Sequence, residues 1–182
     1  MFEETLKAFG RLDILINNAG IGEQKIIDET DDDWMLYVMN TNLGGPMRYI
    51  REALKIFLPQ NDGVIINISS VNGTRPFCGA TYTSTKGALN TLTKNVAIRL
   101  IDTNIRYNAV APGATITPAH IANKAGQQPG GDKMLQYSGH FVYFPGPECQ
   151  AIDQAYACLY LASKMGRAVK GQVLQVCNGA FL

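Results

Sequence analysis

The sequence predicts an α/β fold with a mainly parallel sheet. Three short apolar runs, at 12–16, 64–68 and 105–110, have the length of buried strands and are bounded by turn-forming residues. Amphipathic helical patterns over 44–58 and 82–100 separate them. Strands that alternate with helices are typical of parallel sheets, and such sheets bind their ligands at the carboxyl ends of the strands.

The remaining elements follow from local patterns. The spacing of apolar residues predicts a first helix over 1–9 that has no visible N-terminal cap. Thr30 and the three aspartates after it predict a capped helix over 34–39, and this acidic run is interpreted as a solvated cap rather than a metal site. Near the C-terminus, the sequence predicts a helix over 147–163 and a last strand over 172–176.

Composition limits the classes of function. With 182 residues, 46% of them hydrophobic, the chain is long enough for one domain with a core. The net charge of +1 gives no electrostatic footprint for nucleic acid or for an anionic membrane surface. Four scattered cysteines and two histidines suggest neither a zinc site nor a disulfide framework, so we expect a reducing, cytoplasmic environment. There is no signal-peptide pattern and no apolar run of roughly 18 residues.

Helical periodicity is lost over 114–147, which glycines and prolines interrupt. A long irregular segment within a compact domain is often functional. Its aromatic residues Phe141, Tyr143 and Phe144 are interpreted either as an anchor onto the core or as an apolar wall that faces a substrate.

Tyr82 and Lys86 are four residues apart, so on a helix they share one face. A free phenol has a pKa of about 10, and a fixed cation beside it lowers that value. A tyrosine in this setting can exchange a proton with an alcohol or a carbonyl. The pair alone is also compatible with an ordinary exposed helical pair.

Other marked residues are predicted to lie at the same edge of the sheet. Asn18-Ala19-Gly20 follows the first strand, where small side chains let a ligand approach the backbone, although a plain turn is the alternative. Ser70 follows the second strand and Pro112-Gly113 the third. Because unrelated surface residues would not all gather at one edge, we take this coincidence as the functional signal.

Taken together, the motifs resemble those of the classical short-chain dehydrogenase/reductase family, over 2–182. The motifs in chain order are Asn17-Asn18-Ala19-Gly20, Thr41-Asn42-Leu43, 67–73 (Asn-Ile-Ser-Ser-Val-Asn-Gly), Tyr82 to Lys86, 108–113 (Asn-Ala-Val-Ala-Pro-Gly) and Gly171-Gln172-Val173. The resemblance implies a Rossmann-like, doubly wound sheet in a single, partial domain over 1–182. About four strands are retained, and 114–147 is the substrate-loop region.

The resemblance also implies an NAD(P)-dependent oxidoreductase that interconverts a secondary alcohol and a ketone. Tyr82 would be the acid/base. Lys86 would lower the pKa of Tyr82 and hold the nicotinamide ribose, and Ser70 would hydrogen-bond the substrate oxygen. Asn42 would hold a water that links Lys86 to solvent, unless it only caps the start of a helix.

A larger set of residues is expected to surround NAD or NADP, and no metal is expected. By resemblance these cofactor-binding residues are Asn18, Ala19, Gly20, Tyr82, Lys86, Pro112, Gly113, Thr115 and Thr117. Hydride transfer is the chemistry of the cofactor, while the protein supplies orientation, a proton and hydrogen-bond donors.

The position of the serine requires a choice between two neighbours. The usual spacing of 13 residues before the tyrosine selects Ser69, whereas the Ser-Ser-Val-x-Gly context selects Ser70. We choose Ser70, because a one-residue deletion in a loop is easily accommodated and the strand end determines which side chain points into the cleft.

One part of the family pattern is not found. The family opens with a strand and a glycine-rich Thr-Gly-x-x-x-Gly-x-Gly turn, whereas here only 1–13 precede the Asn-Asn-Ala-Gly strand. If each βα unit has about 30 residues, on the order of 70 residues are expected to be absent. The diphosphate would then lose its backbone donors, and the residue that selects NAD or NADP would be missing. The 12–16 strand would be an edge with a bared apolar face.

Three hypotheses about function follow. The first is an alcohol/ketone oxidoreductase represented by an incomplete sequence, and the second is a non-catalytic binding or structural fragment that cannot bind a dinucleotide. The third is a reduced domain that binds only part of a nucleotide. By resemblance, the helices over 44–58 and 82–100 pair across a two-fold axis, so we expect a homodimer or homotetramer with a small-molecule substrate and no nucleic-acid or membrane partner.

Overall fold

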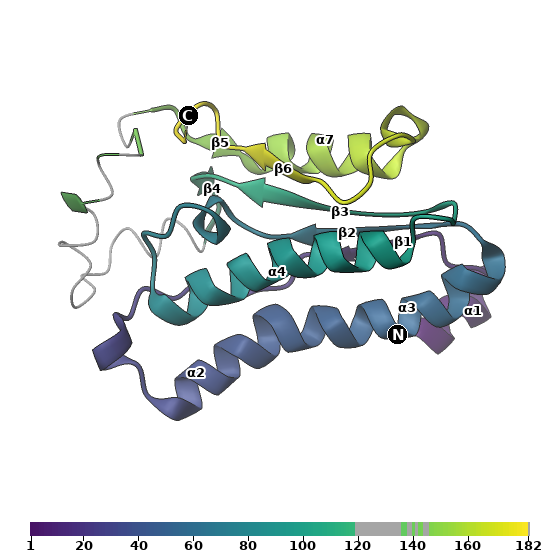
Figure 1. Cartoon of the computed structure of the whole chain (residues 1–182), viewed down its shortest axis with the longest axis horizontal. Coiled ribbons are helices and arrows are strands. Elements are labelled where there is room, and N and C mark those ends of the chain that lie inside the picture. Colours follow the sequence, from purple (N-terminus) through teal and green to yellow (C-terminus); the bar gives the residue numbers. More distant parts are fainter. Residues whose placement is uncertain (119–135, 138–139, 141, 144–145, 182) are drawn as a thin grey trace.

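Four parallel strands in the order β1-β2-β3-β6 form the centre of the fold (Figure 1). In chain order they span Ile14–Asn17, Gly63–Ile68, Ile105–Pro112 and Val173–Val176. The computed structural model describes residues 1–118, 136–137, 140, 142–143 and 146–181. The sheet confirms the predicted α/β, doubly wound architecture, because helices cover both of its faces (Figure 1).

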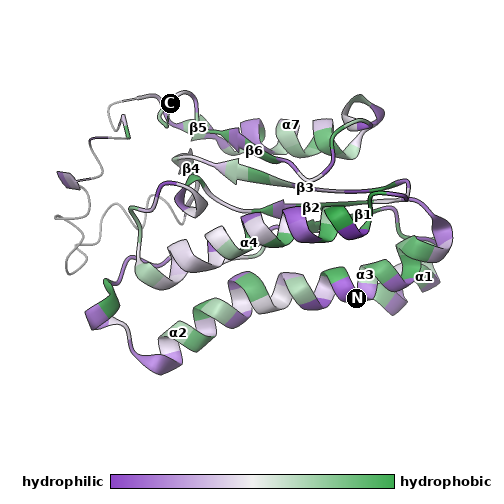
Figure 2. Ribbon diagram, viewed as in Figure 1, coloured by the Kyte–Doolittle hydropathy of each residue, from purple (hydrophilic) through white to green (hydrophobic). Residues whose placement is uncertain are grey.

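The helices divide between the two faces. On one face lie α3 and α4, while α7 lies on the other (Figure 1). The α-helices with bounds in the described part of the chain are α1 (Phe2–Phe9), α2 (Asp32–Met39), α3 (Gly45–Gln60), α4 (Ala80–Arg99) and α7 (Ala151–Ala162). Hydrophobic residues recur along α2 and α3 with hydrophilic ones between them, as an amphipathic helix requires (Figure 2).

Side chains point alternately to the two faces of the sheet along each strand, so a hydrophobic core forms on each face. Ile65 of β2 aligns with Leu15 of β1 and Tyr107 of β3, and these side chains pack with α3 and α4. Ile66 and Val110 belong to the second core cluster, which includes Leu161 of α7. Because successive side chains point to opposite faces, a strand buried on both faces must be apolar throughout, as β2 nearly is.

Within the described residues, β1 pairs only with β2 and is the edge of the sheet. Ile14 and Ile16 are each 44% exposed, whereas Leu15 between them is buried. The inward-facing side of β1 is therefore packed, and its other side leaves apolar surface uncovered, as the sequence predicted.

The helix pair α2 and α3 is joined through a π-helical segment, Asn40–Gly44. Asp31, rather than the predicted Thr30, is the N-cap of α2, because its carboxylate accepts the Trp34 N–H at 2.8 Å. The Thr30 hydroxyl instead donates to the Ile26 carbonyl. The predicted boundary near Gly44 marks the end of the π-helical segment and the start of α3 at the next residue.

A second, two-stranded parallel sheet was not predicted. It pairs β4 (Thr115–Ile116) with β5 (Cys149–Gln150), which precedes α7. The helix predicted from 147 therefore starts later, where the Asp153 carboxylate accepts the Gln150 N–H at 2.7 Å. Short 3₁₀ turns complete the fold at Ile27–Glu29, Val71–Gly73 and Lys164–Gly166.

Candidate active site

The site lies where β1, β2 and β3 end. Parallel strands bring their carboxyl ends to one edge of the sheet, so Asn17, Ile68 and Pro112 end their strands on the same side. The first turns of α4 contribute Tyr82 and Lys86. The structure thus brings together the strand ends and the helix that the motifs marked.

Lys86 is almost completely buried beside Tyr82. Its side chain is 5% exposed, and Nζ lies 5.5 Å from the centre of the Tyr82 ring. Nζ also donates a hydrogen bond of 2.8 Å to the carbonyl of Ile68 at the end of β2. Burial lowers the pKa of Lys86 to about 8, because the charged form is poorly solvated there.

The Tyr82 phenol does not show the expected effect of Lys86. Burial raises the pKa of Tyr82, and the hydrogen bond with Ser70 opposes this in part. The ammonium lies over the face of the ring, where it acts on the π system, and it is bonded to the Ile68 carbonyl. The phenol in this arrangement is therefore protonated at neutral pH and equipped to donate its proton to a carbonyl oxygen.

The two neighbouring serines have different surroundings. The Ser69 hydroxyl lies 2.6 Å from Asn90 Oδ1 and 3.0 Å from the Lys86 carbonyl, so it fastens β2 to α4. Ser70 instead faces the Tyr82 phenol. This geometry supports the assignment of Ser70, because Ser69 is already occupied by acceptors in the interior.

Asn72 supports Ser70, a role that was not predicted from the sequence. Both its backbone N–H and its side-chain amide donate to the Ser70 hydroxyl, at 3.1 and 3.3 Å. Its side-chain oxygen accepts the N–H groups of Phe77 and Cys78, at 3.1 and 2.9 Å. An Asn two residues after a strand-end Ser, where asparagine often organises a turn, was the available signal.

Asn42 lies inside the π-helical segment and is 1% exposed. Its side chain bonds both backbone groups of Ile21, accepting from N at 2.7 Å and donating to O at 2.9 Å. A weaker contact of 3.3 Å reaches Thr85 on α4. Asn42 therefore connects the segment after β1 to α4, the helix that carries Tyr82. This connection is separate from the predicted role of Asn42, which was to hold a water between Lys86 and solvent.

The predicted cofactor residues after β1 lie at the surface of the site. Asn18, Ala19 and Gly20 are all exposed. A Cβ added at Gly20 would lie 3.4 Å from Asn42 Oδ1 and 3.6 Å from Lys86 Nζ, so this backbone directly borders both side chains. Glycine keeps that approach open for a ligand.

The predicted residues after β3 border the opposite side of the site. Gly113 packs so closely against Cys177, the residue after β6, that a Cβ at position 113 would lie 2.6 Å from the Cβ of Cys177. The Thr115 hydroxyl donates to the Gly113 carbonyl at 3.0 Å, and Pro112 is the last residue of β3. Thr117 lies two residues beyond Thr115, just past β4.

An apolar cluster lies beside this edge. Val71, Val142, Cys177 and Phe181 are buried together, and the ring of Phe77 stacks on Phe181 at 5.5 Å. Tyr143, a member of the predicted aromatic wall, is 64% exposed, and its backbone N–H donates a hydrogen bond to the Ala180 carbonyl. The other two members, Phe141 and Phe144, lie outside the described residues, as does much of 114–147.

The chain's own groups fit the ribose of a nicotinamide nucleotide. An ammonium has three donors, and Lys86 uses one of them on Ile68. The exposed backbone at Gly20 lies next to it. Among the described residues, no group of three or more His, Cys, Asp or Glu side chains could hold a metal ion, and no helix is long and apolar enough to cross a membrane.

Comparison with known proteins identifies relatives of this chain among oxidoreductases. The family model described as enoyl-(acyl carrier protein) reductase matches residues 1–180. The chain is 34% identical over 185 residues to 3beta-hydroxysteroid dehydrogenase 2 of Eggerthella lenta. The aligned region covers 98% of this chain and 68% of that protein. It is also 34% identical over 181 residues to (+)-borneol dehydrogenase 2 of Salvia officinalis, covering 96% of this chain and 64% of the relative.

A solved structure shows the same fold. It is a tyrosine-to-phenylalanine variant of ElxO with NADPH bound, and it superposes with a TM-score of 0.80 at 31% identity. The match covers 98% of this chain and 71% of ElxO. Because the family model matches residues 1–180 and the chain is more than 30% identical to these enzymes, it belongs to the classical short-chain dehydrogenase/reductase family of oxidoreductases.

Proposed function

We propose that the site interconverts a secondary alcohol and a ketone, with Tyr82 as the acid/base. The observation that carries the proposal is the meeting of Tyr82, Lys86 and Ser70 at the carboxyl ends of the strands. The hydroxysteroid and borneol dehydrogenases among the relatives support the substrate class by their names. The family uses NAD or NADP, and the bound NADPH in ElxO makes NADPH the first cofactor to test.

Each residue has a role that follows from its position. The Tyr82 phenol gives its proton to the carbonyl oxygen during reduction and takes it back during oxidation. Ser70, beside that phenol, donates a hydrogen bond to the same oxygen as negative charge develops on it. The nicotinamide supplies the hydride.

Lys86 and the backbone at Gly20 would hold the nicotinamide ribose. Lys86 is fixed by its bond to Ile68, and its pKa of about 8 makes it mainly cationic at neutral pH. On the other side of the site, Pro112, Gly113, Thr115 and Thr117 would border the nicotinamide, with Asn18 and Ala19 along the nucleotide. Asn42 holds the Gly20–Ile21 backbone in place through Ile21.

A substitution at Tyr82 tests this proposal. Tyr82→Phe removes the proton donor but keeps the ring beneath Lys86, so we expect kcat for ketone reduction to fall by about 10²- to 10⁴-fold. The binding of NADPH, followed by nicotinamide fluorescence, should change little. A variant with wild-type kcat would contradict the assignment of Tyr82.

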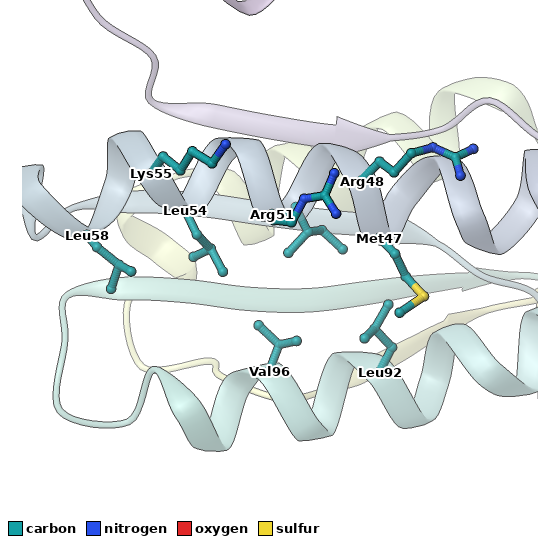
Figure 3. A pocket seen from close by; sticks show the side chains of 9 residues that line it. Met47, Arg48, Arg51, Leu54, Lys55, Leu58, Leu92 and Val96 are labelled. Atoms are coloured by element: carbon teal, nitrogen blue, oxygen red, sulfur yellow. The ribbon is translucent and has the colours of Figure 1, made fainter.

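Assembly as a homodimer is also part of the proposal, together with the cytoplasmic location expected from the composition. A groove between α3 and α4 has an apolar floor that includes Leu54, Leu92 and Val96 (Figure 3). Arg48, Arg51 and Lys55 line the same groove, and Glu52 pairs with the latter two. In a dimer with a two-fold axis, a second copy would place the same apolar residues and the same acidic and basic side chains opposite this groove. We therefore propose that a second copy of the chain covers the groove.

A non-catalytic binding fragment is the second candidate. The observation in its favour is the exposed edge that β1 forms within the described residues. This candidate predicts a folded chain that binds neither NADH nor NADPH. The intact constellation of Tyr82, Lys86, Ser70 and Asn42 favours the enzyme.

A further inference from the structure

Glu23 is a buried acid that the proposed mechanism does not use. It is 4% exposed, although it follows the exposed Asn18–Gly20 turn by only three residues. Its Oε2 accepts the backbone N–H of Tyr82 at 3.0 Å, across 59 positions of sequence. Its Oε1 is buried and has no hydrogen-bond partner in the described part of the chain. A carboxylate in such a position needs a compensating interaction.

The compensation comes from the N-terminus of α4. Gly79, the N-cap of this helix, has no side chain that could satisfy the first N–H groups. The Glu23 carboxylate takes that place from another part of the chain and lies at the positive end of the helix dipole. The N–H it binds belongs to the residue that carries the catalytic phenol.

The fit around this carboxylate requires glycine at position 79. A Cβ there would lie 2.4 Å from the Glu23 carboxyl carbon and from each of its oxygens. The Gly79 N–H also donates to the Glu23 carbonyl at 3.0 Å, and the next N–H, of Ala80, donates to the Lys25 carbonyl at 3.0 Å. The segment after β1 and the start of α4 are therefore joined by side-chain and backbone contacts at one place.

The same segment is held on its other side by Asn42, which binds both backbone groups of Ile21. Residues 21–25 thus connect the proposed nucleotide-binding turn at Gly20 with the backbone of Tyr82. We propose that Glu23 is a positioning residue, whose carboxylate fixes the first turn of α4 and so sets the Tyr82 phenol against Ser70. This inference rests on the proposed function.

Three variants test it against one control. Glu23→Ala removes the acceptor, and Glu23→Gln keeps a side-chain oxygen at the same reach. Gly79→Ala places a methyl group against the carboxylate. Glu29→Ala, at an exposed glutamate in the turn that precedes α2, is the matched control.

We expect Glu23→Ala and Gly79→Ala to lower kcat for ketone reduction by about 10- to 100-fold, because a misplaced catalytic group of this kind loses about that much rate. The KM for the ketone should stay within about 3-fold, since neither variant touches the substrate. Glu23→Gln should keep kcat within about 3-fold of wild type, as should Glu29→Ala. Wild-type kcat in Glu23→Ala, or an equal loss of kcat in Glu23→Gln and Glu23→Ala, overturns the inference.

Amide hydrogen exchange tests the contact without relying on activity. In Glu23→Ala, the peptide that covers 80–86 should exchange at least about 10-fold faster, while the peptide over 89–99 of the same helix stays protected. Unchanged exchange at 80–86 overturns the inference. If the wild-type chain shows no turnover with any ketone, the proposed function fails, and the exchange result then still decides whether Glu23 positions Tyr82.

Discussion

At the scale of single residues, Lys86 carries its charge in a nearly dry environment. Its pKa is about 8 in the folded chain and close to 10.4 when unfolded, so the unfolded state binds the proton more tightly. The contribution of this group to stability is therefore least favourable below pH 8 and increases as the pH rises from about 8 to about 10. The single bond to Ile68 does not replace the lost hydration.

Lys86→Met should accordingly raise the free energy of unfolding at pH 7, by about 1–3 kcal/mol. The same variant should lose ketone reduction, because the side chain that would hold the nicotinamide ribose is gone. Urea unfolding at pH 7 and pH 9.5 checks the first expectation, with the exposed Lys94→Met as the control. A variant that is less stable than wild type at pH 7 would contradict this reading of Lys86.

The activity of the two serine variants should differ, although both variants should lose stability. Ser70→Ala removes the donor beside Tyr82 and the acceptor of two Asn72 N–H groups, so we expect kcat to fall by about 10²- to 10³-fold and stability to fall by about 1–3 kcal/mol. Ser69→Ala leaves Asn90 without its partner in the interior, which should also cost about 1–3 kcal/mol while kcat changes by less than about 3-fold. Steady-state kinetics and thermal unfolding of both variants measure these effects, and an equal loss of kcat in the two variants would contradict the assignment of Ser70.

At the scale of elements, close approach of α4 to the turn after β2 holds the site together. A Cβ at Gly73 would lie 2.8 Å from the Lys86 carbonyl oxygen and 2.5 Å from Asn90 Nδ2. The first of these is backbone, which cannot move aside without shifting α4. Glycine at this position therefore allows Ser70 and Lys86 to approach each other.

Gly73→Ala should destabilise the chain by about 2 kcal/mol or more and lower kcat, because α4 is displaced. Gly87→Ala is the matched control, since its Cβ would meet only the Gly73 carbonyl at an ordinary 3.6 Å. That control lies inside α4 and should be up to about 1 kcal/mol more stable than wild type. Equal unfolding midpoints for the two variants would contradict the packing argument.

The sequence was sufficient to predict the main elements and the place of the site. Apolar runs of strand length, such as 64–68, located the sheet because a strand buried on both faces has few alternatives. Strand-end motifs then placed Ser70 and Tyr82 at one edge. The role of Glu23 could not be predicted, because it depends on the Tyr82 N–H, which only the folded chain brings near. Asn72 had a local signal, its place two residues after Ser70, but that signal does not specify the N–H groups that its side chain accepts.

The missed elements have the same explanation. The pairing of β4 with β5 joins two-residue strands more than 30 positions apart, and no pattern in so short a strand predicts its partner. The π-helical segment at Asn40–Gly44 has no compositional signal of its own. Where two caps compete, as at Thr30 and Asp31, only the backbone geometry decides between them.

At the scale of the whole molecule, uncovered apolar surface predicts assembly. The groove between α3 and α4 includes Leu92 and Val96, and Met47 beside it is 49% exposed (Figure 3). Val96→Glu would place a charge on the proposed two-fold contact, so we expect light scattering to show a shift from dimer to monomer. Ile98→Glu, at a residue of α4 that is 73% exposed and does not line the groove, should leave the mass unchanged. A monomeric wild-type chain would contradict the proposed dimer.

The central claim is that this chain uses a nicotinamide cofactor to reduce a ketone at Tyr82. The most direct measurement is the fluorescence of NADPH mixed with the folded chain, first alone and then with a panel of cyclic and open-chain ketones. We predict saturable binding, followed by a loss of fluorescence that depends on the ketone and is absent in Tyr82→Phe. A folded chain that leaves the fluorescence of NADPH and of NADH unchanged, with and without ketone, would contradict the claim and favour the non-catalytic fragment.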